Sequence, residues 1–264
     1  MIAARPSLVL IPQYFGALVF DRRTSRYAPF DGDAARVLEA LRVHGVDAVL
    51  RDHCRALAAS VDECSVDDMK ADVRALASHL HERGWLTLDG KLAAARIHRE
   101  PPADHLLGPL AVHLEIIGAC NLACTHCFAG ELPRNHDPLT VLEMDRLFGE
   151  MAGVGALRLG LTGGEPLMRK DLLDILDAAT EHGLHPCITS NALLIDDRIA
   201  RELGKRDLVW LNISLEGATA ASNDAIRGAG VFDGVRKKLE LLREHARFTL
   251  AFTITSHNAN EVEA

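Results

Sequence analysis

Apolar and polar positions follow two different patterns along the chain, and the pattern changes near residue 100. In the first part, short apolar runs at 7–12 and 16–20 predict two β-strands, and a third strand is expected at 27–30. Helical spacing follows, because apolar residues recur three and four positions apart after Ser65. These residues are Val66, Met69, Val73, Leu76, Ala77 and Leu80.

Cap and turn residues complete the layout of this first part. Asp31 and Asp33 offer N-caps for an amphipathic helix that Gly45 would end. Residues 46–63 are weakly periodic and favour a short helix and a turn. An Asp-Gly pair at 89–90 predicts a hairpin after the second long helix. Strands, three helices and a hairpin make the layout of a winged helix, a small α+β domain with many uses.

Two adjacent prolines, Pro101 and Pro102, lie in a polar stretch after this layout ends. Proline restrains φ and removes a backbone donor, so the pair disfavours helix and sheet and holds the chain extended. We therefore predict a winged-helix-like domain at 1–98, a linker at 99–110 and a second domain at 111–264.

Strand and helix patterns alternate through the second domain. Strands are expected at about 111–117, 156–161, 185–189, 208–214 and 247–254. Helices are expected at about 140–152, 170–182, 196–203 and 231–245. This alternation predicts an α/β fold, a partial TIM-like (βα) barrel with a parallel sheet and with active residues at the carboxyl ends of its strands.

The charge of the chain is uneven. The first 100 residues hold 14 basic and 14 acidic side chains, so the remainder carries the whole formal charge of −8. Neither part has the basic surface that nucleic-acid binding requires. No run of 18 apolar residues predicts a membrane span, and the opening residues lack the apolar core of a signal peptide. We therefore expect a cytoplasmic protein that binds neither nucleic acid nor membrane.

Three cysteines, Cys120, Cys124 and Cys127, lie four and then three positions apart just after the first strand of the second domain. Thiolates on one short loop can bind one face of a four-iron cubane and leave the fourth iron open. Spacing alone leaves two other interpretations: a zinc loop with His126 as the fourth ligand, and buried thiols that cluster by chance. The remaining cysteines form no second motif; they are Cys54, Cys64 and Cys187.

A second motif, Gly163-Gly164-Glu165-Pro166, follows the second of these predicted strands. A CxxxCxxC loop followed by Gly-Gly-Glu-Pro at this separation resembles the radical S-adenosylmethionine (SAM) superfamily, from about residue 111 to the last residue. The resemblance implies a [4Fe-4S] cluster on the three cysteines and SAM as a second cofactor. It also implies reductive cleavage of SAM to a 5′-deoxyadenosyl radical, with an electron donor such as flavodoxin or ferredoxin.

The same resemblance implies roles for single residues around SAM. Backbone at Gly163 and Gly164 can approach a ligand closely because glycine lacks Cβ. Their carbonyls, together with Glu165, would hold the ammonium of SAM, and Pro166 would fix the turn. Arg227 would bind the SAM carboxylate with its guanidinium fork, or else be a surface arginine at a helix start.

Four further residues complete the expected SAM site. Ser214 and Ser190 resemble residues that meet the ribose hydroxyls, with a structural hydroxyl at a strand end as the alternative for either. His126 and Phe128 would flank the adenine. Many relatives have Tyr or Phe where this chain has His126, and histidine can stack in the same way.

The order of elements in 5–95 resembles the peptide-recognition domain of ribosomal-peptide maturases, which includes the small leader-binding protein of pyrroloquinoline quinone synthesis. Such a domain implies that the leader of a precursor peptide binds as an added strand on an exposed sheet edge. We therefore predict a radical SAM enzyme of the SPASM-type peptide-maturase branch, which modifies a ribosomally synthesised precursor peptide. Two alternatives stay open: a radical SAM enzyme acting on a small molecule or cofactor precursor, and a zinc-containing winged-helix regulator.

The family's architecture extends beyond the part that this sequence covers. The family's barrel has six strand–helix units, whereas the chain ends just past the fifth predicted strand. Members with such a front domain commonly carry a cysteine-rich C-terminal extension of the SPASM type that holds auxiliary clusters. We expect residues 1–264 to be a fragment of a longer maturase, and the activity of the fragment by itself stays open.

Overall fold

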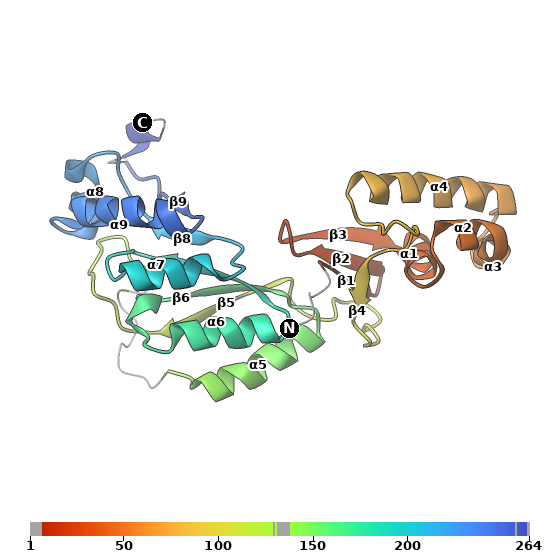
Figure 1. Cartoon of the computed structure of the whole chain (residues 1–264), viewed down its shortest axis with the longest axis horizontal. Helices are drawn as coiled ribbons and strands as arrows, with labels where there is room; N and C mark the ends of the chain where they lie inside the picture. Colours follow the sequence, from red (N-terminus) through yellow and green to blue (C-terminus); the bar gives the residue numbers. More distant parts are fainter. Residues whose placement is uncertain (1–6, 129, 131–137, 257, 263–264) are drawn as a thin grey trace. The chain divides into compact units, whose positions relative to one another are not determined.

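The computed structural model describes residues 7–128, 130, 138–256 and 258–262. Contacts within the chain divide it into two compact units (Figure 1). Unit 1 holds Met1–Leu110 and Gly153–Gly155, and unit 2 holds Ala111–Ala152 and Ala156–Ala264. In the part of the chain that the structure describes, no helix is long and apolar enough to cross a membrane.

Unit 1 is built on a four-stranded sheet with the order β3-β2-β1-β4. Strands β1 (Leu8–Gln13), β2 (Gly16–Asp21) and β3 (Arg26–Asp31) form an antiparallel meander, as the apolar runs predict. The short strand β4 (Ala94–Arg96) was not predicted and pairs parallel to β1. The predicted hairpin is reduced to one bridge, between Leu86 and Leu92.

The helices of unit 1 are α1 (Gly32–His44), α2 (Val46–Ala48), the π-helical η1 (Val49–His53), α3 (Cys54–Ala58) and α4 (Val66–Glu82). Among them, α1 begins at the predicted cap Asp31 and ends at Gly45, and α4 begins at the predicted cap Ser65. The Asp31 carboxylate accepts from the backbone N–H of Ala34, and Ser65 forms a capping box with Asp68. The weakly periodic segment 46–63 is a chain of short helical turns.

The core of unit 1 joins one face of the sheet to the apolar stripes of the helices. Its fully buried members include Leu8, Leu10 and Val19 of the sheet, Val37, Leu38 and Leu41 of α1, Val73 and Leu80 of α4, and Trp85. Alternate strand residues and helix residues three or four apart reach the same core, so the two periodicities of the sequence explain its composition.

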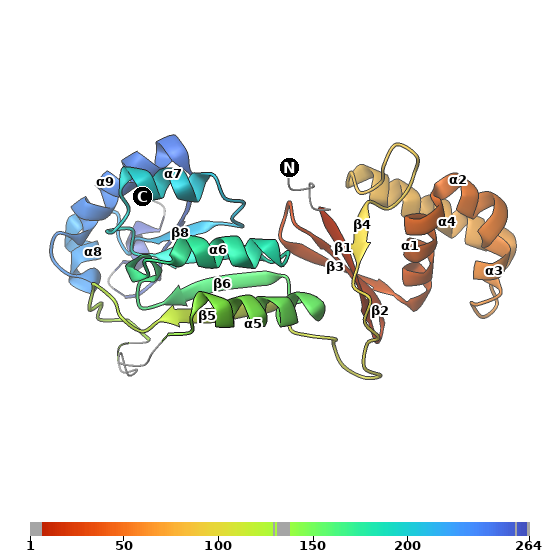
Figure 2. The same cartoon turned by 60° about the horizontal axis from the view of Figure 1, so that its bottom comes forward.

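Unit 2 has five parallel strands in sequence order: β5 (Ala111–Ile117), β6 (Arg158–Gly163), β7 (His185–Ser190), β8 (Leu211–Ser214) and β9 (Thr249–Ala251). The connecting helices are α5 (Val141–Gly153), α6 (Leu172–Glu181), α7 (Asp197–Gly204) and α9 (Val231–His245). Crossovers of one hand between sequential parallel strands put their helices on one face of the sheet, which Figures 1 and 2 show for α5, α6 and α7. The α/β fold of a partial barrel is therefore confirmed.

Helix α8 (Ala220–Arg227) is the element of unit 2 that the sequence did not predict. Its buried residues are Asn223, Ile226 and Arg227. Two of these three are polar, so the segment has no apolar stripe to reveal a helix. Two short 3₁₀ turns, η2 (Pro166–Met168) and η3 (Ala259–Glu261), complete the unit.

Candidate active site

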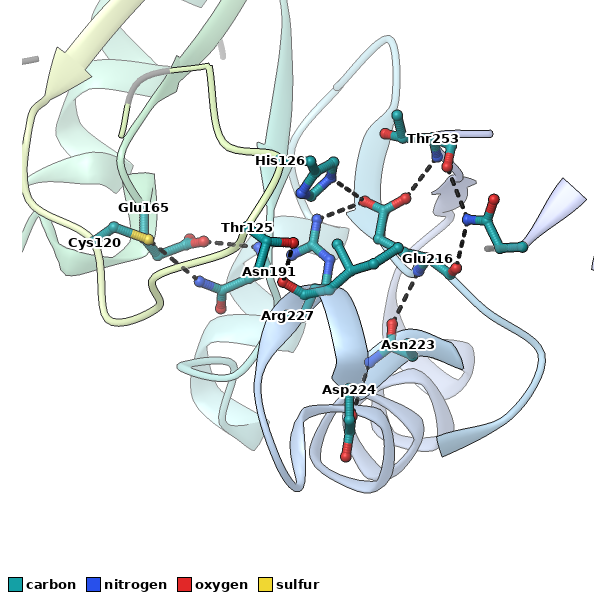
Figure 3. Close-up of polar contacts among 12 residues, drawn as sticks. Cys120, Thr125, His126, Glu165, Asn191, Glu216, Asn223, Asp224, Arg227 and Thr253 are labelled. Atoms are coloured by element: carbon teal, nitrogen blue, oxygen red, sulfur yellow. Dashed lines mark hydrogen bonds and ion pairs between the residues drawn. The ribbon is translucent and has the colours of Figure 1, made fainter. Parts of the chain in front are cut away.

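The predicted site residues lie where strands of the parallel sheet end. The cysteine loop follows β5, the Gly-Gly-Glu-Pro turn follows β6, Ser190 ends β7 and Ser214 ends β8. Because the strands are parallel, these four segments share one edge of the sheet. The close-up in Figure 3 shows Cys120 of the cysteine loop, Glu165 of the turn and Asn191, the residue after Ser190, beside one another.

The two glycines of the turn are required because the backbone of the turn lies very close to the backbone of residues 117–119. Gly163 has φ +133°, a value that L side chains rarely adopt, and a Cβ at Gly164 would overlap the carbonyl oxygen of Ala119. The N–H of Gly164 donates to Ile117 O (2.7 Å), and the N–H of Glu165 donates to Ala119 O (2.9 Å). The Gly-Gly turn is therefore joined to the first residues of the cysteine loop.

Glu165 is a buried carboxylate with three protein donors. Its Oε1 accepts from Ser190 Oγ (2.7 Å) and from the N–H of Leu167 (3.0 Å), and its Oε2 accepts from the N–H of Asn191 (2.7 Å). Burial raises the pKa of Glu165 above its ordinary value, although these hydrogen bonds act in the opposite direction. A carboxylate has about four acceptor positions, so one remains on Oε2 for a cationic ligand.

Ser190 and Asn191 connect Glu165 to the cysteine loop. The Ser190 hydroxyl donates its one hydrogen to Glu165 and accepts from the N–H of Ala192 (2.9 Å), so it acts as a structural hydroxyl here. A contact between Ser190 and ribose stays a prediction. The Asn191 amide donates to Asn121 Oδ1 (2.7 Å) and lies 4.0 Å from the sulfur of Cys120 (Figure 3).

The three motif cysteines differ in environment. Cys120 and Cys124 are half-buried, whereas Cys127 is exposed. Burial raises the pKa of the Cys124 thiol by more than the nearby Arg227 lowers it. Within the described ranges, no three His, Cys, Asp or Glu side chains converge to form a metal site. Three thiols on the short loop 120–127, with no carboxylate among them, suit an iron–sulfur cluster, and binding one would require the loop to draw the sulfur atoms together.

A second buried carboxylate, Glu216, joins the cysteine loop to α8 and to the segment after β9. Its Oε1 accepts from Arg227 Nη2 (2.9 Å) and lies 3.3 Å from Nε2 of His126, and its Oε2 accepts from the N–H of Thr253 (2.6 Å). Burial alone would raise the pKa of Glu216, but Arg227, Thr253 and His126 together outweigh burial and lower it. Glu216 is therefore held as the charged partner of Arg227.

The backbone of Glu216 is bound as firmly as its side chain. Its N–H donates to Asn223 Oδ1 (2.9 Å), and its carbonyl accepts from Asn258 Nδ2 (2.8 Å). Asn223 and Asn258 are completely buried, at 0% exposure each. Figure 3 shows this set of contacts around Glu216. A fixed backbone aims the carboxylate at one position, which suits an orienting role.

Arg227 is only 8% exposed and is the last residue of α8, so it is neither on the surface nor at a helix start. Its buried Nε has no hydrogen-bond partner among the described residues. The preceding carbonyl, Ile226 O, accepts from the N–H of Thr125 (2.9 Å), which joins α8 to the cysteine loop. An open pocket of about 440 Å³ contains both Cys120 and Arg227 in its lining.

The remaining predicted residues have contrasting settings. Ser214 is buried at the end of β8, and its hydroxyl has no partner in the part of the chain that the structure describes. The ring of Phe128 is 80% exposed. The His126 ring is half-buried, with Nε2 directed at Glu216 and with a buried Nδ1 that has no described partner. Neither ring stacks on an aromatic ring of another described residue.

Comparison with known proteins supports a functional site at this edge of the sheet. The family model of the radical SAM superfamily matches residues 114–264, which include the cysteine loop and all four strand ends. The chain belongs to the radical SAM superfamily. The match covers the whole of unit 2 beyond the first residues of β5.

Relatives of this radical SAM chain include curated maturases. It is 32% identical over 157 residues to the mycofactocin maturase MftC of Mycobacterium ulcerans, a match that covers 59% of this chain and 42% of the relative. It is 34% identical over 149 residues to the PqqA peptide cyclase of Bradyrhizobium diazoefficiens, covering 56% and 39%. These matches therefore span about two fifths of the length of the curated relatives.

Solved structures give a likeness of fold. The crystal structure of Streptococcus suis SuiB bound to precursor peptide SuiA matches with a TM-score of 0.65 and 17% identity. The match covers 98% of this chain and 58% of the SuiB chain. At this identity it shows a shared fold and nothing about ligands.

Two residues at this edge of the sheet, Glu216 and Asn191, were not among the predicted site residues. Both follow strand ends, Glu216 two positions after Ser214 and Asn191 directly after Ser190. The rule that active residues lie at carboxyl ends of parallel strands was therefore a signal for both. The partners of Glu216 could not be predicted, because His126 and Thr253 are distant from it in the sequence.

Proposed function

We propose that this radical SAM protein reductively cleaves SAM and uses the resulting 5′-deoxyadenosyl radical to modify a ribosomally synthesised precursor peptide. Membership of the radical SAM superfamily supports the cleavage of SAM. The modification of a peptide is supported by a relative, the PqqA peptide cyclase, and by the SuiB structure, whose fold resembles both units of this chain.

Cys120, Cys124 and Cys127 would hold a [4Fe-4S] cluster, and SAM would lie beside it. When bound, the cluster supplies one electron for cleavage of a sulfur–carbon bond, with the electron delivered by a flavodoxin or ferredoxin. The open pocket between the cysteine loop and the end of α8 supports this placement of the cofactor. Glu165, with its remaining acceptor position, is suited to an ammonium, as a charge-assisted hydrogen bond.

Arg227 would act on the SAM carboxylate through the nitrogen atoms that Glu216 leaves free. The buried Nε without a described partner supports this role, since a buried donor without an acceptor is unfavourable until a ligand supplies one. Ser214 would reach a ribose hydroxyl, because its own hydroxyl is not engaged by the described residues. His126 and Phe128 would flank the adenine, and the contact of His126 Nε2 with Glu216 Oε1 (3.3 Å) restrains the His126 ring.

Unit 1 would bind the leader of the precursor. Its sheet ends on one side in β3, whose outer edge pairs with no other described strand, so a peptide could add there by backbone hydrogen bonds. The winged-helix-like layout and the match of SuiB over nearly the whole chain support this assignment. Residues 7–98 would then deliver the peptide, and unit 2 would react with it.

Anaerobic reconstitution of the chain with iron and sulfide tests the cluster. We expect a brown protein with about four irons, and 5′-deoxyadenosine after addition of SAM and dithionite. The triple variant Cys120→Ala, Cys124→Ala, Cys127→Ala should lose iron and product. The matched control Cys64→Ala, outside the motif, should retain both. A colourless protein with one zinc and no 5′-deoxyadenosine would support the zinc-containing regulator instead.

The substrate class needs a separate experiment. A synthetic peptide encoded by a short reading frame beside the gene should change in mass when it is incubated with the reconstituted whole protein, SAM and reductant. Turnover of SAM with no peptide bound or altered, together with consumption of a small molecule, would favour the alternative of a cofactor precursor. The two outcomes leave the cluster assignment unaffected.

A further inference from the structure

A pocket of about 760 Å³ lies in unit 1, where the turn from β2 to β3 meets the residues after α4. Its lining comes from the end of β2, the first four residues of β3, and the side chains of Arg83 and Trp85. It is unusual in charge, because it contains three arginines, Arg23, Arg26 and Arg83, and one carboxylate, Asp21.

Asp21 neutralises one of the three arginines and is fully occupied by its neighbours. Its Oδ1 accepts from Arg23 Nε (3.1 Å) and from the backbone N–H of Arg23 (2.9 Å). Its Oδ2 accepts from Arg23 Nη2 (3.0 Å) and from the indole N–H of Trp85 (3.1 Å). With four donors on the one carboxylate, nothing remains for another cation.

Arg26 and Arg83 are left without a negative partner. Both are exposed, and neither forms an ion pair with any residue that the structure describes. The Arg83 guanidinium lies 5.0 Å from the centre of the Trp85 ring, a cation–π contact that holds it over the pocket. The pocket therefore presents two uncompensated positive charges beside the Trp85 ring, although residues 1–100 as a whole hold equal numbers of basic and acidic side chains.

The pocket adjoins the free edge of the unit 1 sheet. Strand β3 pairs on one side with β2 and is the outermost strand of the order β3-β2-β1-β4 (Figure 1). Pro29 in the middle of β3 is compatible with this position, since proline within sheets is confined largely to edge strands. Arg26 is the first residue of β3, so the pocket lies at one end of the line that an added strand would follow.

We propose that this pocket binds aspartate or glutamate side chains of an extended peptide whose backbone pairs with β3. The inference rests on the proposed function, because it names the chemistry of the leader that unit 1 would select. Guanidinium groups bind carboxylates in a bidentate geometry that a neutral side chain cannot reproduce. Backbone hydrogen bonds form with any peptide sequence. The two arginines would therefore provide the specificity and would fix the position of the peptide along β3.

Selection from a displayed library of random 12-residue peptides against the whole chain tests the proposal. We expect enriched peptides to carry an acidic residue at a constant distance from their apolar positions. Binding of one such peptide, measured by fluorescence anisotropy, should weaken about fivefold in the double variant Arg26→Gln, Arg83→Gln. The matched control Arg55→Gln changes an exposed arginine of α3 outside the pocket and should bind normally.

Three kinds of result would overturn the proposal, and they can be distinguished from one another. Enriched peptides without acidic residues, or equal binding by the double variant and the wild type, would refute the acidic specificity and leave peptide binding by unit 1 in place. No enrichment of any peptide would refute both the acidic specificity and peptide binding by unit 1. Equal binding of a 12-nucleotide single strand that competes with the peptide would show an unspecific polyanion site. Formation of 5′-deoxyadenosine is independent of all three.

Discussion

Arg227 Nη2 and Glu216 Oε1 lie 2.9 Å apart, and both side chains are almost completely buried. The two residues come from different elements, the end of α8 and the loop after β8. Removing one member of a buried pair leaves an uncompensated charge, which is more unfavourable than the pair is favourable. The pair therefore fixes the end of α8 to the loop after β8. Arg227 also lines the pocket beside the cysteine loop, so the pair stabilises that wall of the pocket.

The first prediction concerns this pair. Glu216→Ala should lower the free energy of unfolding by about 3–5 kcal/mol, because Arg227 and the N–H of Thr253 lose their acceptor. Urea denaturation of the chain without cluster measures the change. Glu240→Gln, an exposed carboxylate on α9, is the control and should stay within about 0.5 kcal/mol of wild type. A similar small effect of both variants would contradict a supporting role for Glu216.

The second prediction is the pH dependence of Glu165. Its pKa is raised by burial from an ordinary value of 4.5, so the wild type loses stability as pH rises from about 4.5 through the raised value. Glu165→Gln cannot titrate and should be less stable by about 1–3 kcal/mol at pH 5, since one donor loses its acceptor. This deficit should shrink between pH 5 and pH 7.5 in denaturation curves. A deficit that grows with pH would mean that the folded-state pKa is lowered.

A third prediction uses the close approach of the two loops. A Cβ at Gly164 would overlap the carbonyl of Ala119, so Gly164→Ala should destabilise the chain by at least about 2 kcal/mol and reduce the iron retained after reconstitution. At Gly153 a Cβ would meet nothing within 4 Å, so Gly153→Ala should be neutral or slightly stabilising. Thermal unfolding and iron analysis compare the two. Equal effects would show that the space at Gly164 does not matter.

The fourth prediction separates the cysteines by reactivity. Burial raises the pKa of Cys187 to about 11, so at pH 8 only about one thiol in a thousand is ionised. Iodoacetamide should therefore leave Cys187 unmodified while it modifies the exposed Cys127, as peptide mass spectrometry can follow. After reconstitution, Cys120, Cys124 and Cys127 should all become protected. Continued labelling of Cys127 in a brown, iron-loaded protein would exclude it as a ligand.

Much of the fold could be predicted because its determinants are local. The capping box of Thr140 with Glu143, in which Thr140 N donates to the Glu143 carboxylate (2.8 Å), begins α5 as its sequence indicates. Ser65 begins α4 with a capping box as well, and the Asp31 side chain caps α1 by accepting from the N–H of Ala34. Strand β4 was missed because three small or charged residues become a strand only by pairing with β1, nearly ninety positions earlier.

By itself, the sequence determined the class of chemistry. The spacing of Cys120, Cys124 and Cys127, followed by Gly163 to Pro166, identifies the radical SAM superfamily, because both motifs are short segments whose function is set by neighbouring residues. Periodicity likewise determined the alternation of strands and helices, and thus the edge where the site lies.

Only the tertiary structure decided which side chains support that chemistry. Glu216 meets Arg227, His126 and Thr253, and Glu165 meets Ser190 and Asn191. These partners are brought together by the order of strands in the sheet. Burial then raises the pKa of one carboxylate, while a buried guanidinium lowers the pKa of the other. Local sequence contains neither the partners nor the burial, since both arise when segments distant in the chain pack against each other.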